Sequence, residues 1–484
     1  VPLPSGESMD WHEPVLIAYV ALLALLSLNG LHRLWMIWEW RSTRSLPKFD
    51  TLDEWPMVTV QLPIFNERFV IERLARAVAR LDYPREKLHI QVLDDSTDDT
   101  TEIAQGIVDE LAAEGLDIVR IHRTDRTGFK AGALDEGLDV AKGDLVAVFD
   151  ADFVPQPDFL RRTIPVLLQE GIGLVQTRWG HINAQDSWLT RAQSTLLDGH
   201  FVIEQGARHG SGRWFNFNGT AGVWRREAIE AGGGWQHDTL TEDLDLSYRS
   251  QLAGWRFVYL PEVVAPAELP PTMTAFKSQQ HRWAKGSVQT AKKLLGTIWR
   301  SDHPLRLKLE ATGHLCANFS YPLLVVLSLL LPWAVVARLE GGENVMGLLA
   351  ADLVLFTTAM VPFILFYAAA IMGAEAPQPG RRLAQLPGVL ALGVGLAISQ
   401  SRAVFEGMFG KVGVFVRTPK YGGTAGALVY RAAQSGLVGL EALMALYLFG
   451  ACAYVVWAGD YLSLPFLLLF AGGYAIVAGY SLRE

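Results

Sequence analysis

The sequence predicts an α/β domain with a mostly parallel sheet, inserted between transmembrane α-helices. Short apolar strands alternate with amphipathic helices from about residue 55 to residue 268, which is the pattern of an α/β domain. Long apolar runs flank this region, and most charged residues lie between Arg33 and Arg306. A polar domain attached to a membrane domain accounts for this uneven distribution of charge.

Bulk composition narrows the class of protein. The 484 residues are 50% hydrophobic and 19% charged, and they include 15 Trp, which is high for a purely soluble chain. The net charge of -8 argues against a nucleic-acid partner, because phosphate binding requires a basic surface. Cys316 and Cys452 both lie in apolar stretches, so we expect them in a membrane core rather than in a disulfide.

The first element expected is a membrane-spanning helix over residues 15–38, an apolar run of about the 20 residues that a bilayer requires. Acidic residues precede the run and basic residues follow it, namely Glu7, Asp10 and Glu13 before it and Arg33, Arg41, Arg44 and Lys48 after it. The positive-inside rule then places the N-terminus outside and the following domain in the cytoplasm. The alternative is a buried helix in the core of a soluble domain.

The α/β region follows. Strands are expected at residues 58–62, 88–93, 118–122 and 145–149, with helices at 70–80 and 99–114, between the last two strands, and at 244–252. In parallel sheets, ligands bind beyond the carboxyl ends of the strands. The sequence contains neither G-x-G-x-x-G nor G-x-x-x-x-G-K-[ST], so the usual glycine-rich phosphate loops are absent from it.

Acidic groups lie where two of these strands end and where the last helix begins. The groups are Asp94-Asp95, Asp150-Ala151-Asp152 and Glu242-Asp243. Alternation along a strand aims both carboxylates of an Asp-x-Asp to the same side, which suits a hard divalent cation that bridges a pyrophosphate. Any single group could instead be a turn or a helix N-cap. Three of them in one domain predict a metal–nucleotide site.

Two amphipathic segments and a second membrane region complete the chain. Residues 186–208 and 274–300 combine aromatic and charged side chains, so they are expected along the membrane surface, with ordinary solvent-facing helices as the alternative. Apolar runs at 315–337 and 346–372, and at 437–458 and 462–481, predict two helical hairpins. Residues 384–409 fit a re-entrant or interfacial helix better than a span, because a span would leave basic residues outside. We therefore expect five spans, with a sixth possible.

Seven short motifs occur in a fixed order, and together they resemble one enzyme family. They are LPIFNE (62–67), DDST (94–97), FKAGAL (129–134), DAD (150–152), FNGTAG (217–222), TED (241–243) and QQHRW (279–283). This order resembles the inverting glycosyltransferases of family 2, and within them the cellulose synthase-like synthases. The last motifs are most similar to the mannan and glucomannan synthase branch. The resemblance implies a GT-A type domain.

The resemblance also implies roles for individual residues. Nucleotide-sugar binding falls to Pro63, Glu67, Asp94, Asp95, Lys130, Asp150, Gln279, Arg282 and Trp283. Asp150 and Asp152 are implied to hold Mg²⁺ or Mn²⁺, and Trp283, Asn218, Gly219 and Thr220 to contact the acceptor. Asp243 is implied to be the general base, with Glu242 and Asp152 also catalytic. A base must take the proton of the acceptor hydroxyl as that oxygen attacks the anomeric carbon opposite the diphosphate.

A further segment, FVRTPK at residues 415–420, resembles the gating loop of cellulose synthases. It departs from the usual bacterial form by having Arg417 in place of Val. Thr418 and Lys420 are implied to contact the diphosphate. The alternative is a cytoplasmic loop that is basic because of the positive-inside rule.

The combined interpretation is a membrane-embedded synthase with four parts. They are a transmembrane helix (1–40), a cytoplasmic transferase domain (41–270), interface helices (271–312) and a channel region (313–484). The enzyme would extend a β-linked hexose polymer from GDP-mannose or UDP-glucose in the bacterial inner membrane, in contact with membrane lipids. One alternative is a transferase that adds a single sugar to a lipid, as ceramide glucosyltransferase-like proteins do. Another is a transporter with a vestigial transferase domain.

Overall fold

The computed structural model describes residues 11–42, 52–340, 345–375, 377–410, 413 and 436–484. The chain divides into two compact units, which are described separately. The sheet unit comprises Trp38–Asn318 with Arg402–Ala433, and the helical unit comprises Val1–Ile37, Phe319–Ser401 and Gln434–Glu484.

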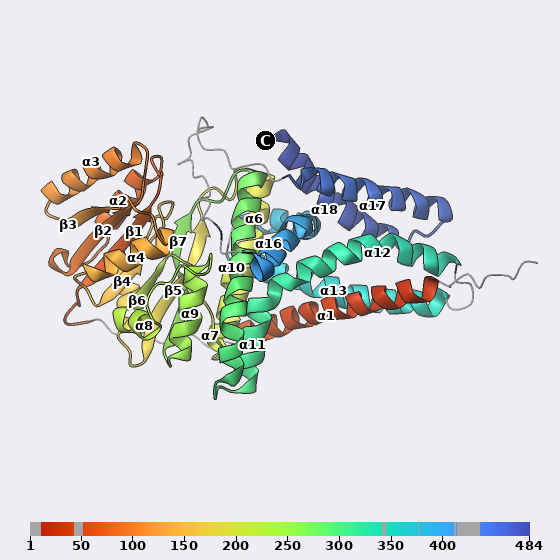
Figure 1. The fold of residues 1–484 in the computed structure, drawn as a ribbon, viewed down its shortest axis with the longest axis horizontal. Helices are drawn as coiled ribbons and strands as arrows, with labels where there is room; N and C mark the ends of the chain where they lie inside the picture. Colours follow the sequence, from red (N-terminus) through yellow and green to blue (C-terminus); the bar gives the residue numbers. More distant parts are fainter. Residues whose placement is uncertain (1–10, 43–51, 341–344, 376, 411–412, 414–435) are drawn as a thin grey trace, which may run out of the picture. The chain divides into compact units, whose positions relative to one another are not determined.

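The sheet unit is built on a seven-stranded mixed sheet (Figure 1). Its strands are β1 (Val58–Ile64), β2 (Leu88–Asp94), β3 (Asp117–His122), β4 (Leu145–Val148), β5 (Ile172–His181), β6 (Gly222–Arg225) and β7 (Arg256–Ala267). The order is β3-β2-β1-β4-β6-β5-β7, and β6 runs antiparallel to both of its neighbours. The four strands expected from the sequence are β1–β4, and all four are confirmed. They pair with one another in parallel. β5, β6 and β7 were not predicted from the sequence.

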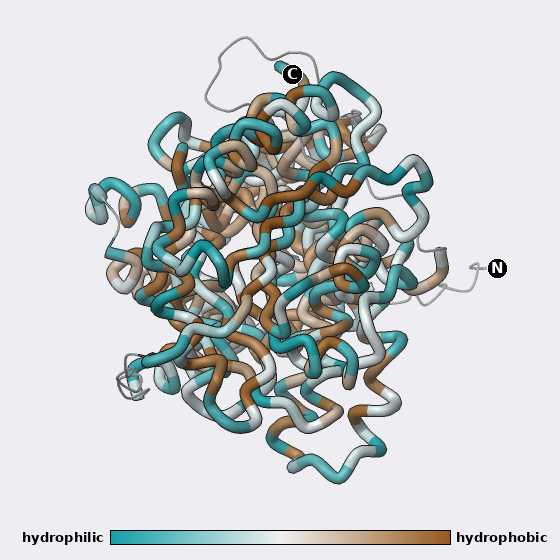
Figure 2. Tube along the Cα trace, turned by 90° about the vertical axis from the view of Figure 1, so that its left-hand side faces the viewer, coloured by the Kyte–Doolittle hydropathy of each residue, from teal (hydrophilic) through white to brown (hydrophobic). Residues whose placement is uncertain are grey.

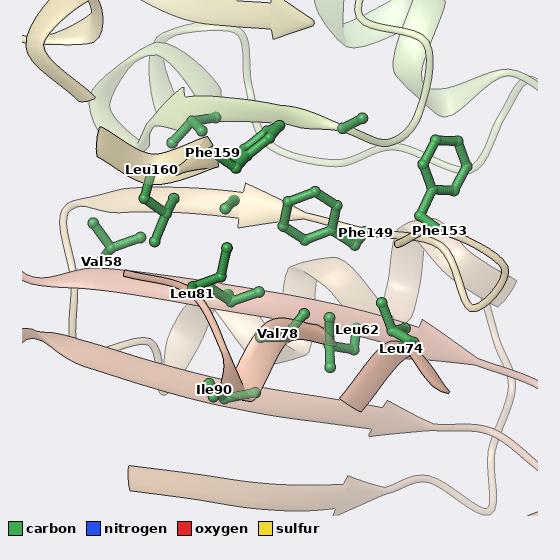
Figure 3. Close-up of a cluster of buried hydrophobic side chains, with 14 of the residues drawn as sticks. Val58, Leu62, Leu74, Val78, Leu81, Ile90, Phe149, Phe153, Phe159 and Leu160 are labelled. Carbon is green, nitrogen blue, oxygen red and sulfur yellow. The ribbon is translucent and has the colours of Figure 1, made fainter. Parts of the chain in front are cut away.

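Helices cover both faces of the sheet. They are α2 (Ile71–Ala79), α3 (Thr100–Ala113), α4 (Phe129–Asp139), α5 (Phe159–Leu167), α8 (Arg226–Ala231) and α9 (Glu242–Leu252), and a short 3₁₀ turn covers Arg85–Lys87. Figure 3 shows Val58 and Leu62 of β1 in one cluster with Leu74 and Val78 of α2, and α5 adds Phe159 to the same cluster. The opposite face packs Val146 and Trp224 against Leu134 of α4. Alternate residues of one strand therefore fill two different cores.

The hydropathy of the chain follows this layering. Figure 2 views the molecule from the side of β3, and hydrophobic stretches run through the middle of that view, while hydrophilic residues prevail along its edges. Leu62, Leu74 and Phe159 are each 0% exposed, so the core excludes water completely at these positions. Burial of such side chains stabilises the fold by about 1.5–3 kcal/mol each.

Four further helices belong to the sheet unit. The segment expected as one amphipathic helix over 186–208 is α6 (Trp188–Asp198), a π-helical turn (Gly199–Glu204) and α7 (Gln205–Gly210). The other expected segment is α10 (Met273–Arg300), which packs beside α11 (Leu305–Cys316). Ser187 caps α6 because its hydroxyl accepts the N–H of Thr190, whose hydroxyl accepts the Ser187 N–H in return.

The helical unit consists of long apolar helices. They are α1 (His12–Ser42), α12 (Ser320–Glu340), α13 (Val345–Gly373), α14 (Pro379–Ala384), α15 (Leu386–Gly395), α16 (Ala397–Phe409), α17 (Val438–Ala458) and α18 (Leu464–Arg483), with a 3₁₀ turn at Ala317–Phe319 before α12. α1 and α16 continue into the sheet unit. In the part of the chain that the structure describes, five helices are long and apolar enough to cross a membrane. In length and apolar composition, these helices match the five expected spans.

The sixth candidate is the bent pair α15 and α16, which meet at 43°. By length and composition this pair fits either one broken span or a re-entrant loop. The structure therefore agrees with the expectation for residues 384–409 and leaves both forms open.

Candidate active site

The sequence-predicted motifs converge on one pocket of the sheet unit. The register pairs Ile64 at the end of β1 with Asp94 at the end of β2, so the segments that follow these strands start at the same edge. Most of the lining comes from the motifs, namely Pro63, Glu67, Asp95, Lys130, Asp150, Asp152, Asn218, Gly219, Glu242, Asp243, Gln279, Arg282 and Trp283. The pocket therefore lies beyond the carboxyl ends of parallel strands, where such sheets bind ligands.

Lys130, at the start of α4, joins three of these motifs. Its ammonium lies 2.5 Å from Asp150 Oδ1, donates to Gly219 O at 2.8 Å and lies 4.0 Å from Glu242 Oε1. Burial disfavours the ammonium, but the charges of Asp150 and Glu242 outweigh burial, and the pKa of Lys130 is raised. Lys130 is therefore a fixed positive charge among carboxylates.

Asp150 and Asp152 follow β4 and reach the pocket from its end. The Asp150 N–H donates to Thr220 Oγ1 at 2.9 Å, which fixes the main chain of the motif. Asp152 Oδ2 accepts the N–H of Glu268 at 3.2 Å, and Arg73 holds the Glu268 carboxylate at 2.6 Å. Two carboxylates on one pocket wall fit Mg²⁺ or Mn²⁺, which use one or two carboxylates and take their remaining ligands from phosphate and water.

Glu242 and Asp243 begin α9 and are crowded together. Asp243 Oδ1 accepts the N–H of Leu244 at 2.8 Å, a bond that favours the carboxylate. Burial and the neighbouring charge of Glu242 act more strongly, and together they raise the pKa of Asp243 to about 7. Burial likewise raises the pKa of Glu242, against the charge of Lys130. A carboxyl whose pKa lies near neutral pH is well matched to proton abstraction.

Gly219 is confined by this arrangement. Its φ is +81°, and a Cβ there would lie 3.0 Å from Asp243 Oδ2 and 3.3 Å from Lys130 Nζ. A side chain at this position would push directly against the carboxylate and the ammonium. Glycine is therefore required for both the backbone angle and the close approach.

The QQHRW motif lies within α10. Gln279, Arg282 and Trp283 are spaced i, i+3 and i+4, so they share one face of the helix, and all three line the pocket. Burial lowers the pKa of Arg282 to about 10, although Glu242, Asp150 and Asp243 oppose that shift, so the guanidinium stays charged at neutral pH. The ring of Trp283 lies 6.4 Å from that of Trp179. A cation and aromatic faces can hold phosphate and sugar, respectively.

Another part of the pocket lining is aromatic and basic. The Asp95 carboxylate is held by Arg123 in two hydrogen bonds of 2.7 and 2.6 Å, which raise the pKa of Arg123. Arg126 stacks over the ring of Phe65 with its guanidinium carbon 3.3 Å from the ring centre. A planar cation on an aromatic ring next to a polar carboxylate is a suitable surface for a nucleobase.

Some predicted residues do not line the pocket. Asp94 is 0% exposed, and its carboxylate is held by Arg120 at 3.0 Å and His122 at 3.2 Å. Thr220 is also 0% exposed and acts through its bond to Asp150. Thr418 and Lys420 lie outside the described residues.

Several lining residues were missed by sequence reasoning, namely Phe65, Arg126, Trp179, His181 and Glu268. Glu268 directly follows β7, and His181 ends β5. The signal that found the other carboxylates, a polar residue at a strand end, applies to both. It could not be used because these two strands were not predicted.

Comparison with known proteins shows similarity to glycosyltransferases. Residues 56–286 match the family model described as "Glycosyltransferase like family 2". The chain is 45% identical over 262 residues to glucomannan 4-beta-mannosyltransferase 1 of Oryza sativa subsp. japonica, covering 51% of this chain and 50% of that protein. It is 44% identical over 254 residues to glucomannan 4-beta-mannosyltransferase 7 of Arabidopsis thaliana, covering 51% and 46%. The chain thus spans about half the length of the relatives it matches.

One solved structure shares the fold. The mannosyltransferase PcManGT from Pyrobaculum calidifontis, in complex with GDP-Man and Mn²⁺, aligns with a TM-score of 0.54 at 22% identity. The alignment covers 82% of this chain and 99% of that one. The sheet unit therefore has the GT-A glycosyltransferase fold, as the resemblance implied.

Proposed function

We propose that this chain is an inverting synthase that extends a β-linked hexose polysaccharide, most simply β-1,4-mannan or glucomannan, because residues 56–286 match the family model of glycosyltransferase-like family 2. The names of the plant relatives support a mannosyl donor and a β-1,4 product. The observation that carries the proposal is the pocket itself. Asp150, Asp152, Asp243 and Arg282 converge there with an aromatic wall.

In this mechanism, Asp243 takes the proton of the acceptor hydroxyl. Its raised pKa makes it a stronger base than an ordinary carboxylate, and it is still largely ionised above pH 7. The attacking oxygen approaches the anomeric carbon from the side opposite the leaving diphosphate, so an α-linked donor gives a β-linked product. Arg282 is placed to hold the diphosphate, and Trp283 offers its ring to the acceptor sugar.

Asp150 and Asp152 are the residues that would hold a divalent metal, Mg²⁺ or Mn²⁺. When bound, the metal would offset the negative charge that builds up on the nucleoside diphosphate. The complex of PcManGT with GDP-Man and Mn²⁺ supports the use of a divalent metal with a nucleotide sugar. Pro63, Glu67 and Asp95 remain the proposed residues of the nucleoside end, beside Phe65 and Arg126.

We also propose that the helical unit is a channel for the product and that the sheet unit faces the cytoplasm, where nucleotide sugars are made. The five apolar helices and the basic residues after α1 support this arrangement. The division of the chain at residues 40, 270 and 312 stays a prediction. The bacterial inner membrane that the sequence suggested has no support, because the relatives reported above are plant proteins.

The test is donor turnover by the purified protein in detergent. GDP-mannose, UDP-glucose, UDP-N-acetylglucosamine and UDP-galactose are supplied with Mn²⁺ or Mg²⁺, and nucleoside diphosphate release is measured. We expect release from GDP-mannose and an insoluble product that β-mannanase digests. The Asp243→Asn variant serves as the inactive control.

Other outcomes would overturn the proposal. A single-sugar product that partitions into organic solvent would assign the chain to glycolipid synthesis. Turnover of UDP-glucose alone, with a product cut only by cellulase, would replace mannan by glucan. No turnover of any donor would contradict an autonomous synthase.

A further inference from the structure

A chain of polar side chains leads from the acceptor end of the pocket into the helices behind it. Asn218 lines the pocket, and three of its groups are held by residues of other elements. Its main-chain N–H donates to Gln176 Oε1 at 2.9 Å, and its Oδ1 accepts from Gln205 Nε2 at 2.6 Å. Its Nδ2 lies 2.8 Å from His200 Nε2. The side chain of Asn218 therefore has one fixed orientation.

Hydrogen-bond chemistry identifies the donor at each contact between Gln205, Asn218 and His200. Gln205 Nε2 also donates to the carbonyl oxygen of Asn216 at 3.0 Å, and a carbonyl can only accept, so this atom of Gln205 must be the amide nitrogen. The atom of Asn218 that faces it is then the oxygen, which leaves the Asn218 NH₂ toward His200. His200 Nε2 must accept, and its proton lies on Nδ1.

The proton on His200 Nδ1 has a suitable acceptor. Glu204 Oε2 lies 3.0 Å from Nδ1, one turn further along the π-helical segment that carries both residues. Arg208 Nη1 lies 3.5 Å from the same oxygen of Glu204, and Arg208 Nε donates to Glu310 Oε1 of α11 at 3.0 Å. Arg208 and Glu310 are both buried, at 3% and 7% exposed. Buried ion pairs of this kind hold their members in a single geometry.

The π-helical turn makes this contact available. A π turn inserts a residue into a helix and rotates the following side chains, and such turns occur frequently at functional sites. Here the turn lies between α6 and α7 and supplies His200 and Glu204, while Gln205 begins α7. His200 and Gln205 both contact the side chain of Asn218, and Glu204 holds His200 from behind. Asn218 precedes Gly219, whose carbonyl accepts from Lys130.

We propose that His200 is a positioning residue, which acts through Asn218 to fix the floor of the acceptor site next to Asp243. This inference rests on the proposed function, because it concerns how the acceptor hydroxyl is brought to the base. His200 itself does not line the pocket. Its effect is transmitted through the Asn218 amide to the adjacent Gly219. Gly219 lies close to the Asp243 carboxylate, because a Cβ at this position would lie 3.0 Å from Asp243 Oδ2.

The experiment compares His200→Leu, His200→Gln, Asn218→Ala and the double variant His200→Leu/Asn218→Ala. GDP-mannose is the donor and β-1,4-mannohexaose is the added acceptor probe. The leucine leaves the Asn218 NH₂ without its acceptor, whereas the glutamine oxygen can replace His200 Nε2. We expect His200→Leu to lower the kcat/KM for mannohexaose about tenfold or more, with the KM for GDP-mannose changed by less than about twofold. His200→Gln should recover most of the loss.

The double variant separates a positioning role from a merely structural one. If His200 acts through Asn218, the double variant should be no slower than Asn218→Ala alone. His209→Leu, on the same helical stretch but outside the pocket lining, is the matched control and should leave the mannohexaose kinetics unchanged. Additive losses in the double variant, or equal losses for His209→Leu and His200→Leu, would overturn the proposal.

A second readout needs no substrate. The variants His200→Leu, Asn218→Ala and His200→Leu/Asn218→Ala, together with His209→Leu and His209→Leu/Asn218→Ala, are compared by thermal unfolding in detergent. His200 and Asn218 should show a coupling that His209 and Asn218 do not show. Coupling without turnover of any donor would overturn the proposed function and leave the His200–Asn218 interaction standing. Turnover without coupling would overturn the positioning role alone.

Discussion

Replacing Asp243 by Asn is expected to abolish transfer and, at the same time, to stabilise the fold. Asp243 is a half-buried carboxylate beside Glu242, and the nearest ammonium, Lys130, is already bound to Asp150. Asparagine keeps the shape and can still accept the N–H of Leu244. Only the charge is removed. The variant therefore loses the base. It also loses the charge repulsion between Asp243 and Glu242, which destabilises the wild-type fold.

The expected gain in the free energy of unfolding follows from the raised pKa of Asp243. The pKa of Asp243 rises from 3.8 to about 7 because of burial and of Glu242. About three pKa units correspond to a destabilisation of at most about 4 kcal/mol by the ionised form. The folded state binds this proton more tightly than the unfolded state, so stability falls as the pH rises from about 4 to about 7 and stays level above that.

Asparagine does not titrate, so the advantage of Asp243→Asn should be largest above pH 7 and shrink toward acid pH. Thermal unfolding of the detergent-solubilised protein at pH 5 and pH 8 measures this difference. A gain of about 2 kcal/mol would raise Tm by about 4–8 °C at pH 8 for a domain of this size. Nucleoside diphosphate release should fall by about 10²- to 10⁴-fold in the same variant.

Asp245→Asn is the matched control, two residues along the same helix. Asp245 is 0% exposed and ion-paired, with Arg249 at 2.8 Å and Lys293 at 3.0 Å. Loss of this carboxylate leaves two cations without their buried partner, so the control should destabilise by about 3–5 kcal/mol. Equal stability of Asp243→Asn and wild type at pH 8, or a gain that is the same at both pH values, would refute the electrostatic reasoning.

Three further predictions follow from the site. Asp152→Asn should weaken the Mn²⁺-dependent binding of GDP-mannose about tenfold or more, measured by calorimetry with and without metal, and unchanged metal dependence would exclude Asp152 as a ligand. Gly219→Ala should reduce kcat by more than about tenfold, because the new methyl group lies 3.0 Å from Asp243 Oδ2, and wild-type rates would show that the loop can move away. The kcat/KM of the wild type should fall as the pH drops through about 7, where Asp243 gains its proton, and a limb near pH 4 would contradict the raised pKa of this base.

Local sequence signals predicted the part of the fold that holds the acidic motifs. β1 and β2 alternate apolar and polar residues over most of their length, and both were found within one or two residues. β6 has only four residues, and β7 contains Pro261 and Pro266, so neither shows a clear strand pattern. The antiparallel pairing of β6 depends on long-range contacts, which no local pattern reports.

The two aspartates of the DDST motif illustrate the same limit. Successive residues at a strand end point to opposite sides, so Asp94 and Asp95 cannot both face one ligand. Asp95 reaches the pocket, while Asp94 faces Arg120 and His122 of β3. The alternation was visible in the sequence, but the identity of the outward residue required the position of β3.

The role suggested for His200 could not be predicted at all. Its partners are Glu204, four residues away, and Asn218, 18 residues away, and the chain of contacts ends at Glu310. The contact also depends on a π turn, which shifts the register of an ordinary helix and has no strong sequence signature.

The charges of the pocket explain why a donor would enter together with a cation. Its described lining carries the carboxylates of Glu67, Asp95, Asp150, Asp152, Glu242, Asp243 and Glu268 against the cations of Arg126, Lys130 and Arg282. Arg123 neutralises Asp95 and Arg73 neutralises Glu268 from behind the wall, which still leaves an excess of negative charge. A nucleoside diphosphate is itself an anion, and like charges repel strongly where water is excluded. A divalent cation held by the proposed ligands Asp150 and Asp152 would offset that repulsion. We therefore expect donor binding to depend on the metal, while Asp243 retains the raised pKa that a base requires.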